Sequence, residues 1–264
     1  MNKRCVFFIF VAFFLGILLG CEAFFQLFSL KSLEVSAAGP VSESFFWNNV
    51  SSASLRFWPL FFWEKEKLKK KIESEAPLSF SVDRRGIAGV DIQIEPLYPW
   101  VVGRWKENEF YITREGLAWE SKHVLNKAIE GIVPPKKPLI VFAEGIPSPA
   151  EDASTLIKIL PFPLDLLSGW LDGLSENKWI SRVVQIDVSR REGKYLLKLS
   201  FNGRGEAQVL MWGERSRWKE LSSALSQIMD QLHFLGENVI IDTTYTDRII
   251  VRSMAHGDQE GSGK

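Results

Sequence analysis

The segment "EKEKLKKKIESEAPLSFSVDRRGIAGVDIQIEP", Glu64 to Pro96, changes its apolar period from helical to alternating, which sets the architecture of the first half of the chain. Leu68 and Ile72 lie one turn apart and form a narrow apolar stripe, so they predict a helix that ends at the proline of "ESEAP". Apolar and polar residues then alternate in two segments, Ser79 to Arg84 and Val90 to Glu95. Two such segments joined by a short glycine-containing turn predict a β-hairpin.

The residues before this segment predict a strand and another helix. Leu30, Leu33 and Val35 alternate with polar neighbours, as in a short strand. Ser42 can cap a short helix that runs to about Val50. The predicted order is therefore strand, helix, helix, strand, strand.

The block "LRFWPLFFW", Leu55 to Trp63, is rich in aromatic residues and has two interpretations. Core packing is one of them, because a large aromatic side chain buries roughly 150–250 Å² when it is enclosed. A surface that rests on a bilayer or on a partner helix is the other, because aromatic residues gather at membrane interfaces. The sequence alone leaves both open.

The second half of the chain predicts a β-rich domain with one long packed helix. "EFYITREGLAWE", Glu109 to Glu120, has the strand, glycine turn, strand pattern of a hairpin. Apolar residues recur at helical spacing from Trp218 to Leu235, and Gly236 follows as a stop signal. Further strands are expected at Leu139 to Phe142, Val183 to Val188, Tyr195 to Phe201, Gln208 to Trp212, Val239 to Tyr245 and Arg248 to Arg252. These segments together predict an α+β fold.

The N-terminal apolar run can be interpreted in two ways. Lys3 and Arg4 precede an uncharged stretch from Cys5 to Cys21, which is near the lower length limit for a helix that crosses a bilayer. Such a retained helix would keep the basic start inside and the bulk of the chain outside the cytoplasm. Leu18 to Cys21 also fits the pattern of lipoprotein processing, in which Cys21 becomes the lipid-modified first residue.

Composition and residue spacing exclude several classes of function. The 264-residue chain has 32 basic and 32 acidic residues, so the positive charge expected of a nucleic-acid-binding protein is missing. The three histidines, His123, His233 and His256, lie far apart in the sequence, and both cysteines, Cys5 and Cys21, lie in the apolar run. We therefore expect no metal site, no cofactor, no catalytic residue and no small-molecule substrate.

Several segments have an order and spacing that can be compared with a known family: "FSLKSLEVSAAG", "ESEAP", "VDIQIEP", "EFYITREGLAW", and "VLMWGERSRWKELSSALSQI" leading to "VIIDTTYTDRIIVR". With these segments the chain resembles the FtsQ/DivIB family of bacterial cell-division proteins over Met1 to Arg252. Asp242 and Tyr245 stand as in the family's closing motif, although Thr243-Thr244 replaces the Leu-Arg that the family usually has between them.

The resemblance implies a fold with an N-terminal transmembrane helix, a POTRA-like β-α-α-β-β domain, and a second β-rich domain. The implied organisation is a cytoplasmic start at 1–4, a transmembrane helix with an interfacial belt at 5–28, the POTRA-like domain at 29–96, the β domain at 97–252, and a polar disordered tail at 253–264. The family also implies a non-enzymatic bitopic scaffold at the division septum of the bacterial cytoplasmic (inner) membrane. Its expected partners are coiled-coil proteins of the FtsB/DivIC and FtsL type.

The last strand is the expected partner-binding edge. We predict that Arg248, Ile250 and Arg252 point outward while Ile249 and Val251 point inward, so that a partner strand adds to the unpaired backbone. The resemblance implies that Tyr245 lies near the contact. An ordinary edge strand guarded by arginines is the alternative.

Two other functions are compatible with the same sequence. One is an envelope assembly factor, anchored by lipid or by a helix, that uses a POTRA-type module. The other is a cell-wall enzyme, which would need a pair of carboxylates in a deep cleft.

Overall fold

The structure is a computed structural model, and it describes residues 28–86, 89–149, 155–176, 181–201, 207–213, 224–228 and 238–254, together with single positions at 16, 20, 26, 221 and 231. The chain divides into two compact units. The first runs to Leu97 and includes Leu125–Ile132, and the second comprises Tyr98–Val124 and the chain from Val133 onward.

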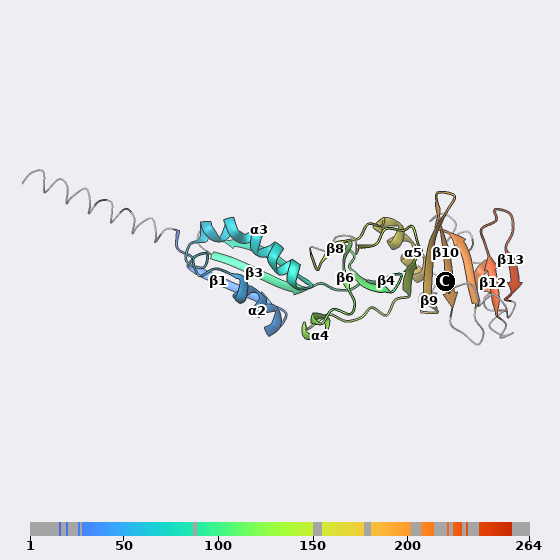
Figure 1. The fold of residues 1–264 in the computed structure, drawn as a ribbon, viewed down its shortest axis with the longest axis horizontal. Helices are drawn as coiled ribbons and strands as arrows, with labels where there is room; N and C mark the ends of the chain where they lie inside the picture. Colours follow the sequence, from blue (N-terminus) through green and yellow to red (C-terminus); the bar gives the residue numbers. More distant parts are fainter. Residues whose placement is uncertain are drawn as a thin grey trace, which may run out of the picture. The chain divides into compact units, whose positions relative to one another are not determined.

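The first unit is built on a three-stranded sheet (Figure 1). Its elements are β1 (Ser32–Ala37), α2 (Pro40–Asn49), α3 (Trp58–Glu75), β2 (Leu78–Arg85) and β3 (Gly89–Pro96), and a short helix, α4 (Leu125–Ala128), belongs to the same unit. β3 lies in the middle of the sheet, parallel to β1 and antiparallel to β2. The order of the first five elements is the one predicted from the sequence.

Helix α3 and the sheet form the core of this unit. Phe61, Leu68 and Ile72 are the buried residues of α3, so the predicted two-residue stripe is the buried face. The alternating apolar residues of β3 are buried, while Gln93 and Glu95 between them are exposed. The helix is longer at its start than predicted, because the aromatic block forms its first turns and a proline stands at the start.

The second unit is built on a ten-stranded mixed sheet with the order β13-β12-β11-β10-β9-β7-β4-β5-β6-β8 (Figure 1). Its strands are β4 (Val101–Trp105), β5 (Asn108–Ile112), β6 (Leu117–Glu120), β7 (Leu139–Phe142), β8 (Lys158–Ile159), β9 (Val183–Arg191), β10 (Lys194–Phe201), β11 (Ala207–Trp212), β12 (Val239–Asp242) and β13 (Ile250–Ser253). Three pairs are parallel, β4 with β7, β7 with β9, and β11 with β12. The predicted hairpin at Glu109 to Glu120 is confirmed as β5 and β6.

Helix α5 (Leu164–Glu176) packs its apolar face into the core of the second unit. Trp170 is buried there and donates a hydrogen bond from its indole nitrogen to the carbonyl oxygen of Gly213 at 2.8 Å. Gly103 in β4 is required for close packing, since a Cβ atom would lie 2.7 Å from side-chain atoms of both Ile112 and Trp105. These contacts fix the sheet that carries the C-terminal edge.

The expected fold class is wrong in its N-terminal transmembrane helix. The structure is mixed α/β and mostly strands, and in its described part no helix is both long and apolar enough to cross a membrane. α3 has 18 residues, but charged residues occupy most positions after Trp63. Of the expected spanning segment, residues 5–28, only positions 16, 20, 26 and 28 are described.

Two other expected elements lie largely outside the described residues. Of the long helix expected from Trp218 to Leu235, positions 221, 224–228 and 231 are described, and they are helical. Leu225 is buried in the core of the second unit. The expected polar tail is described only to Met254, and its first residue, Ser253, belongs to β13.

Candidate partner-binding edge

Strands β12 and β13 form one end of the ten-stranded sheet. They are antiparallel, with Asp242 opposite Ile250 and Val239 opposite Ser253. β13 has β12 as its neighbour on one side, and on the other side no strand of the described chain pairs with it. The strand begins two residues later than predicted, so Arg248 lies in the loop before it.

One backbone hydrogen bond fixes which groups of β13 are used inside the sheet. Met254 donates its N–H to the carbonyl oxygen of Asn238 at 2.8 Å. In an antiparallel pair, hydrogen-bonded and non-hydrogen-bonded residue pairs alternate. Arg252 with Ile240 is therefore the next hydrogen-bonded pair along β13.

The remaining backbone groups of β13 point away from β12. By the same alternation, Val251 and Ser253 direct their N–H and C=O groups toward the side on which no described strand pairs with β13. Ile250 uses its backbone groups to pair with Asp242 inside the sheet. A partner strand would therefore bond to Val251 and Ser253, which sequence alternation did not single out.

The side chains of β13 divide between two faces of the sheet. Val251 is opposite Ile241, which is fully buried, so both lie on the core face. Ile250 and Arg252 lie on the other face, as predicted from alternation. Ile249 packs against the core, and Val251 lies on the expected inward face but remains 46% exposed.

The loop between β12 and β13 is held at its start by side-chain hydrogen bonds. The hydroxyl of Thr243, which is buried, donates to the carbonyl oxygen of Leu210 at 2.8 Å. Trp212 donates its indole N–H to the carbonyl oxygen of Thr244 at 3.1 Å. Asp242 accepts hydrogen bonds from the backbone N–H and the hydroxyl of Thr244. Thr243 and Thr244, which stand where the FtsQ/DivIB family usually has Leu-Arg, thus hold the start of this loop in place.

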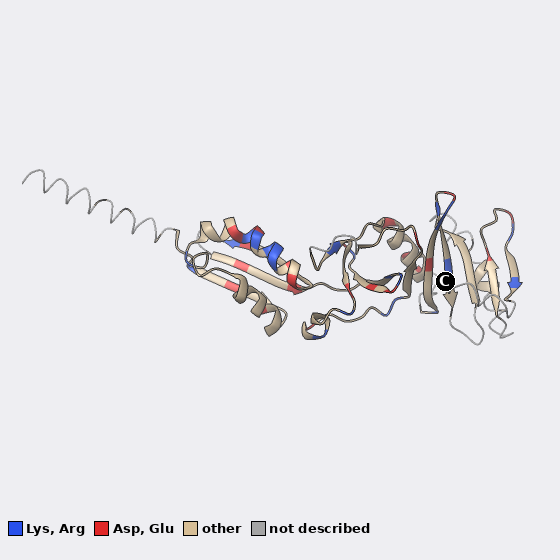
Figure 2. Cartoon of the chain, in the orientation of Figure 1, with Lys and Arg blue, Asp and Glu red and all other residues tan. Residues whose placement is uncertain are grey.

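Tyr245 and Arg248 lie together in this loop. The guanidinium carbon of Arg248 lies 5.2 Å from the centroid of the Tyr245 ring, within cation–π range. Tyr245 is 39% exposed. Basic residues lie both on the loop and on β13 (Figure 2). The structure therefore brings Tyr245 and Arg248 into contact beside the strand that carries Ile250 and Arg252.

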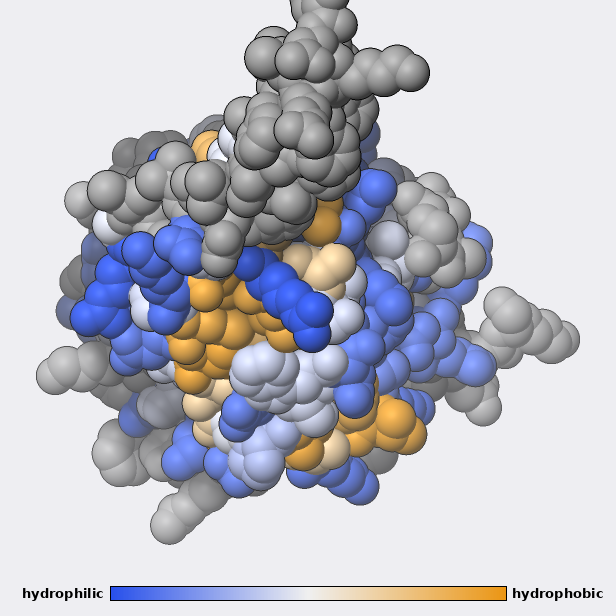
Figure 3. Space-filling view, turned by 90° about the vertical axis from the view of Figure 1, so that its left-hand side faces the viewer, coloured by the Kyte–Doolittle hydropathy of each residue, from blue (hydrophilic) through white to orange (hydrophobic). Residues whose placement is uncertain are grey.

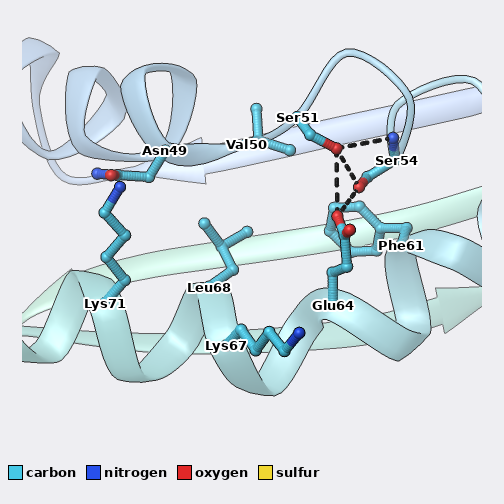
Figure 4. A pocket seen from close by; sticks show the side chains of 9 residues that line it. All are labelled: Asn49, Val50, Ser51, Ser54, Phe61, Glu64, Lys67, Leu68 and Lys71. Carbon is cyan, nitrogen blue, oxygen red and sulfur yellow. Dashed lines mark hydrogen bonds between the residues drawn. The ribbon is translucent and has the colours of Figure 1, made fainter.

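A second candidate site is a pocket of about 130 Å³ between α2, α3 and the loop that joins them in the first unit (Figure 4). Its floor includes Val50, Phe61 and Leu68. Glu64, the carboxylate of the lining, accepts hydrogen bonds from Ser51 at 3.2 Å and from the buried hydroxyl of Ser54. This network ties the loop to α3, and the pocket lacks a second carboxylate for paired acid–base chemistry.

Two basic side chains of the second unit lie against Trp100. Lys137 lies 4.6 Å and Arg114 lies 5.7 Å from the Trp100 ring centroid. Burial, and then the charge of Arg114, lower the pKa of Lys137 below its ordinary value. Among the described residues, no group of three or more histidine, cysteine or acidic side chains could hold a metal ion.

Comparison with known proteins adds no family assignment, because no protein-family model matches the chain and no curated protein matches it. The resemblance to the FtsQ/DivIB family therefore rests on the sequence segments alone. The geometry of the β13 edge stands independently of that resemblance.

Proposed function

We propose that this chain is a non-enzymatic scaffold of a bacterial cell-division complex, which captures coiled-coil partners of the FtsB/DivIC and FtsL type on the edge of β13. The observation that carries this proposal is the pair of outward-facing backbone positions, Val251 and Ser253, at the end of the sheet. The sequence resemblance supports the identity of the partners. No cofactor, nucleic acid or small-molecule substrate takes part.

Strand addition would satisfy four backbone groups at this edge. Val251 and Ser253 each offer one N–H donor and one C=O acceptor. At a net contribution of about 1 kcal/mol per hydrogen bond, the backbone supplies about 4 kcal/mol before side chains are considered. That corresponds to weak binding by itself, so side-chain contacts must supply most of the affinity.

The side chains around the edge define the sequence that a partner strand needs. Val251 offers an exposed apolar contact on the core face of the sheet. Arg252 on the opposite face and Arg248 in the loop favour acidic groups on the partner. Tyr245 adds a partly exposed aromatic surface next to Arg248, and aromatic residues often contribute strongly to interfaces.

Proline substitution at Val251 tests the backbone contact directly. Val251→Pro removes an N–H that points away from β12, so the sheet should keep its internal hydrogen bonds while the edge loses a donor. We expect binding of the purified FtsB- and FtsL-type proteins of the same organism to weaken about tenfold or more, measured by isothermal titration calorimetry. Val251→Ala is the matched control, because it shortens the side chain and keeps the N–H.

A proline at Ile250 provides the opposite control. It removes an N–H that pairs with β12, so it should destabilise the edge itself and lower the unfolding midpoint. If Val251→Pro folds normally and binds both proteins with undiminished affinity, strand addition at β13 is wrong. If Val251→Ala weakens binding as much as Val251→Pro, side-chain packing rather than the backbone carries recognition.

A further inference from the structure

An aromatic cluster lies at the end of the first unit where α3 begins. The ring of Phe28 lies 5.8 Å from that of Phe57 and 5.7 Å from that of Trp58, and Trp58 lies 6.3 Å from Phe62. A backbone bridge between Ser29 and Phe57 holds the two segments together. Rings from two distant parts of the sequence therefore form one surface.

This cluster is a surface rather than part of the core. Phe61, the one core residue of the aromatic block, is 1% exposed and faces the sheet. Its neighbours Phe57, Trp58 and Phe62 are only half-buried, and Trp63 is 76% exposed. The space-filling view of this end shows hydrophobic side chains gathered beside strongly hydrophilic ones (Figure 3). Most of the aromatic block is therefore only partly buried.

Basic side chains stand at the same level as the rings. The Lys65 amine lies 5.6 Å from the Phe62 ring centroid, and the Arg84 guanidinium lies 4.5 Å from that of Trp58. Arg56, one residue before Phe57, is exposed. Its carbonyl oxygen accepts a hydrogen bond from the N–H of Leu30, and the residue after Leu30, Lys31, is also exposed. The cluster is thus rimmed by positive charge.

Glu64, the first acidic residue of α3, is engaged inside the first unit. Glu64 accepts hydrogen bonds from Ser51 and Ser54 in the pocket between the helices. The first turn of α3 carries no acidic residue, and the start of a helix is itself electropositive. The local surface therefore favours a ligand that combines negative charge with an apolar layer beneath it.

We propose that this end of the first unit lies against an anionic lipid surface. Trp63 and Phe62 would sit at the level of the lipid headgroups, and Lys65, Arg84 and Arg56 would contact phosphate groups. A bilayer provides negatively charged headgroups directly above an apolar layer. This arrangement suits a cluster in which aromatic rings and basic side chains lie next to one another. A protein partner of the same fit would need an apolar patch enclosed by acidic residues. The proposal concerns the first unit and is independent of β13.

A lipid-proximity measurement on the full chain tests the contact. The variant Trp63→Cys, with Cys5→Ser and Cys21→Ser, carries a single fluorophore and is mixed with vesicles of phosphatidylglycerol and phosphatidylethanolamine that contain spin-labelled lipid. We expect strong quenching of the fluorophore by the spin label. Trp47→Cys in the same background is the matched control, since Trp47 is an exposed tryptophan on α2 of the same unit, and its label should be quenched little.

Changing the charge of the lipid, or of the basic side chains, tests whether electrostatic attraction holds the label at the membrane. Replacing the anionic lipid by phosphatidylcholine should release the label at position 63, and Lys65→Gln or Arg56→Gln should each weaken the contact about fivefold. Equal quenching at positions 63 and 47, or equal quenching in both kinds of vesicle, would overturn the proposal. Burial of the label at 63 without vesicles that rises with protein concentration would overturn it in favour of a contact between two copies.

Discussion

Replacement of Leu68 tests whether α3 is docked on its sheet as the structure describes. Leu68 is 8% exposed, and Ile72, one turn later, is fully buried. Shortening such a side chain to alanine costs roughly 2–5 kcal/mol, depending on how well the space is refilled. Leu68 also lines the open pocket between the helices, where water can enter, so we expect about 2 kcal/mol for Leu68→Ala and about 4 kcal/mol for Ile72→Ala.

A charge at the same position should cost more than the cavity. Leu68→Asp places a carboxylate on the buried face of α3, one turn after Glu64, which already occupies the pocket. A buried and poorly compensated charge is far more costly than a lost methyl group. We therefore expect Leu68→Asp to unfold the first unit at temperatures at which the alanine variants remain folded.

Thermal unfolding followed by hydrogen exchange of β3 reports the first unit selectively. For a domain of this size, a loss of 1 kcal/mol lowers the unfolding midpoint by about 4–8 °C. The midpoint of Ile72→Ala should therefore fall roughly twice as far as that of Leu68→Ala. Exchange of β9 and β10 in the second unit serves as the internal control. Equal midpoints for wild type, Leu68→Asp and Ile72→Ala would refute the docking of α3.

Three further outcomes are expected. Trp170→Phe should lower the free energy of unfolding by about 1–3 kcal/mol in urea, because the carbonyl oxygen of Gly213 loses a buried donor. Gly103→Ala should cost about 1–3 kcal/mol by crowding Ile112, measured in the same way. Burial raises the pKa of Glu73, so the stability linked to its proton is present at low pH and is lost as pH rises through the folded pKa. Glu73→Gln should therefore gain stability relative to wild type between about pH 4 and pH 7, checked by urea unfolding across that range.

Strands and helices can be predicted from the sequence where the apolar residues repeat with a single spacing. β2 and β3 extend one residue beyond the predicted strand at each end, because their alternation matches a sheet with one buried face. The start of α3 was missed, since consecutive aromatic residues give neither a helical nor an alternating period. β4 was missed because the buried residues of "VVGRW" alternate through a glycine, which a hydrophobicity pattern counts as neutral.

The candidate edge shows a different limit of sequence reasoning. A period of two assigns each side chain of β13 to a face, and the assignments of Ile250 and Arg252 follow from it. The direction of the backbone hydrogen bonds depends instead on the register with β12, which no pattern within the strand contains.

At Val251, the face of the side chain and the direction of the backbone groups both favour an added strand. Its backbone groups point away from β12, and its side chain lies on the core face of the sheet but remains exposed. One added strand would therefore cover an apolar side chain and pair the backbone of the same residue. An edge kept free of partners would place a charge at such a position, as Arg252 does on the opposite face. The exposed valine is the feature that favours a partner-binding edge over a guarded one.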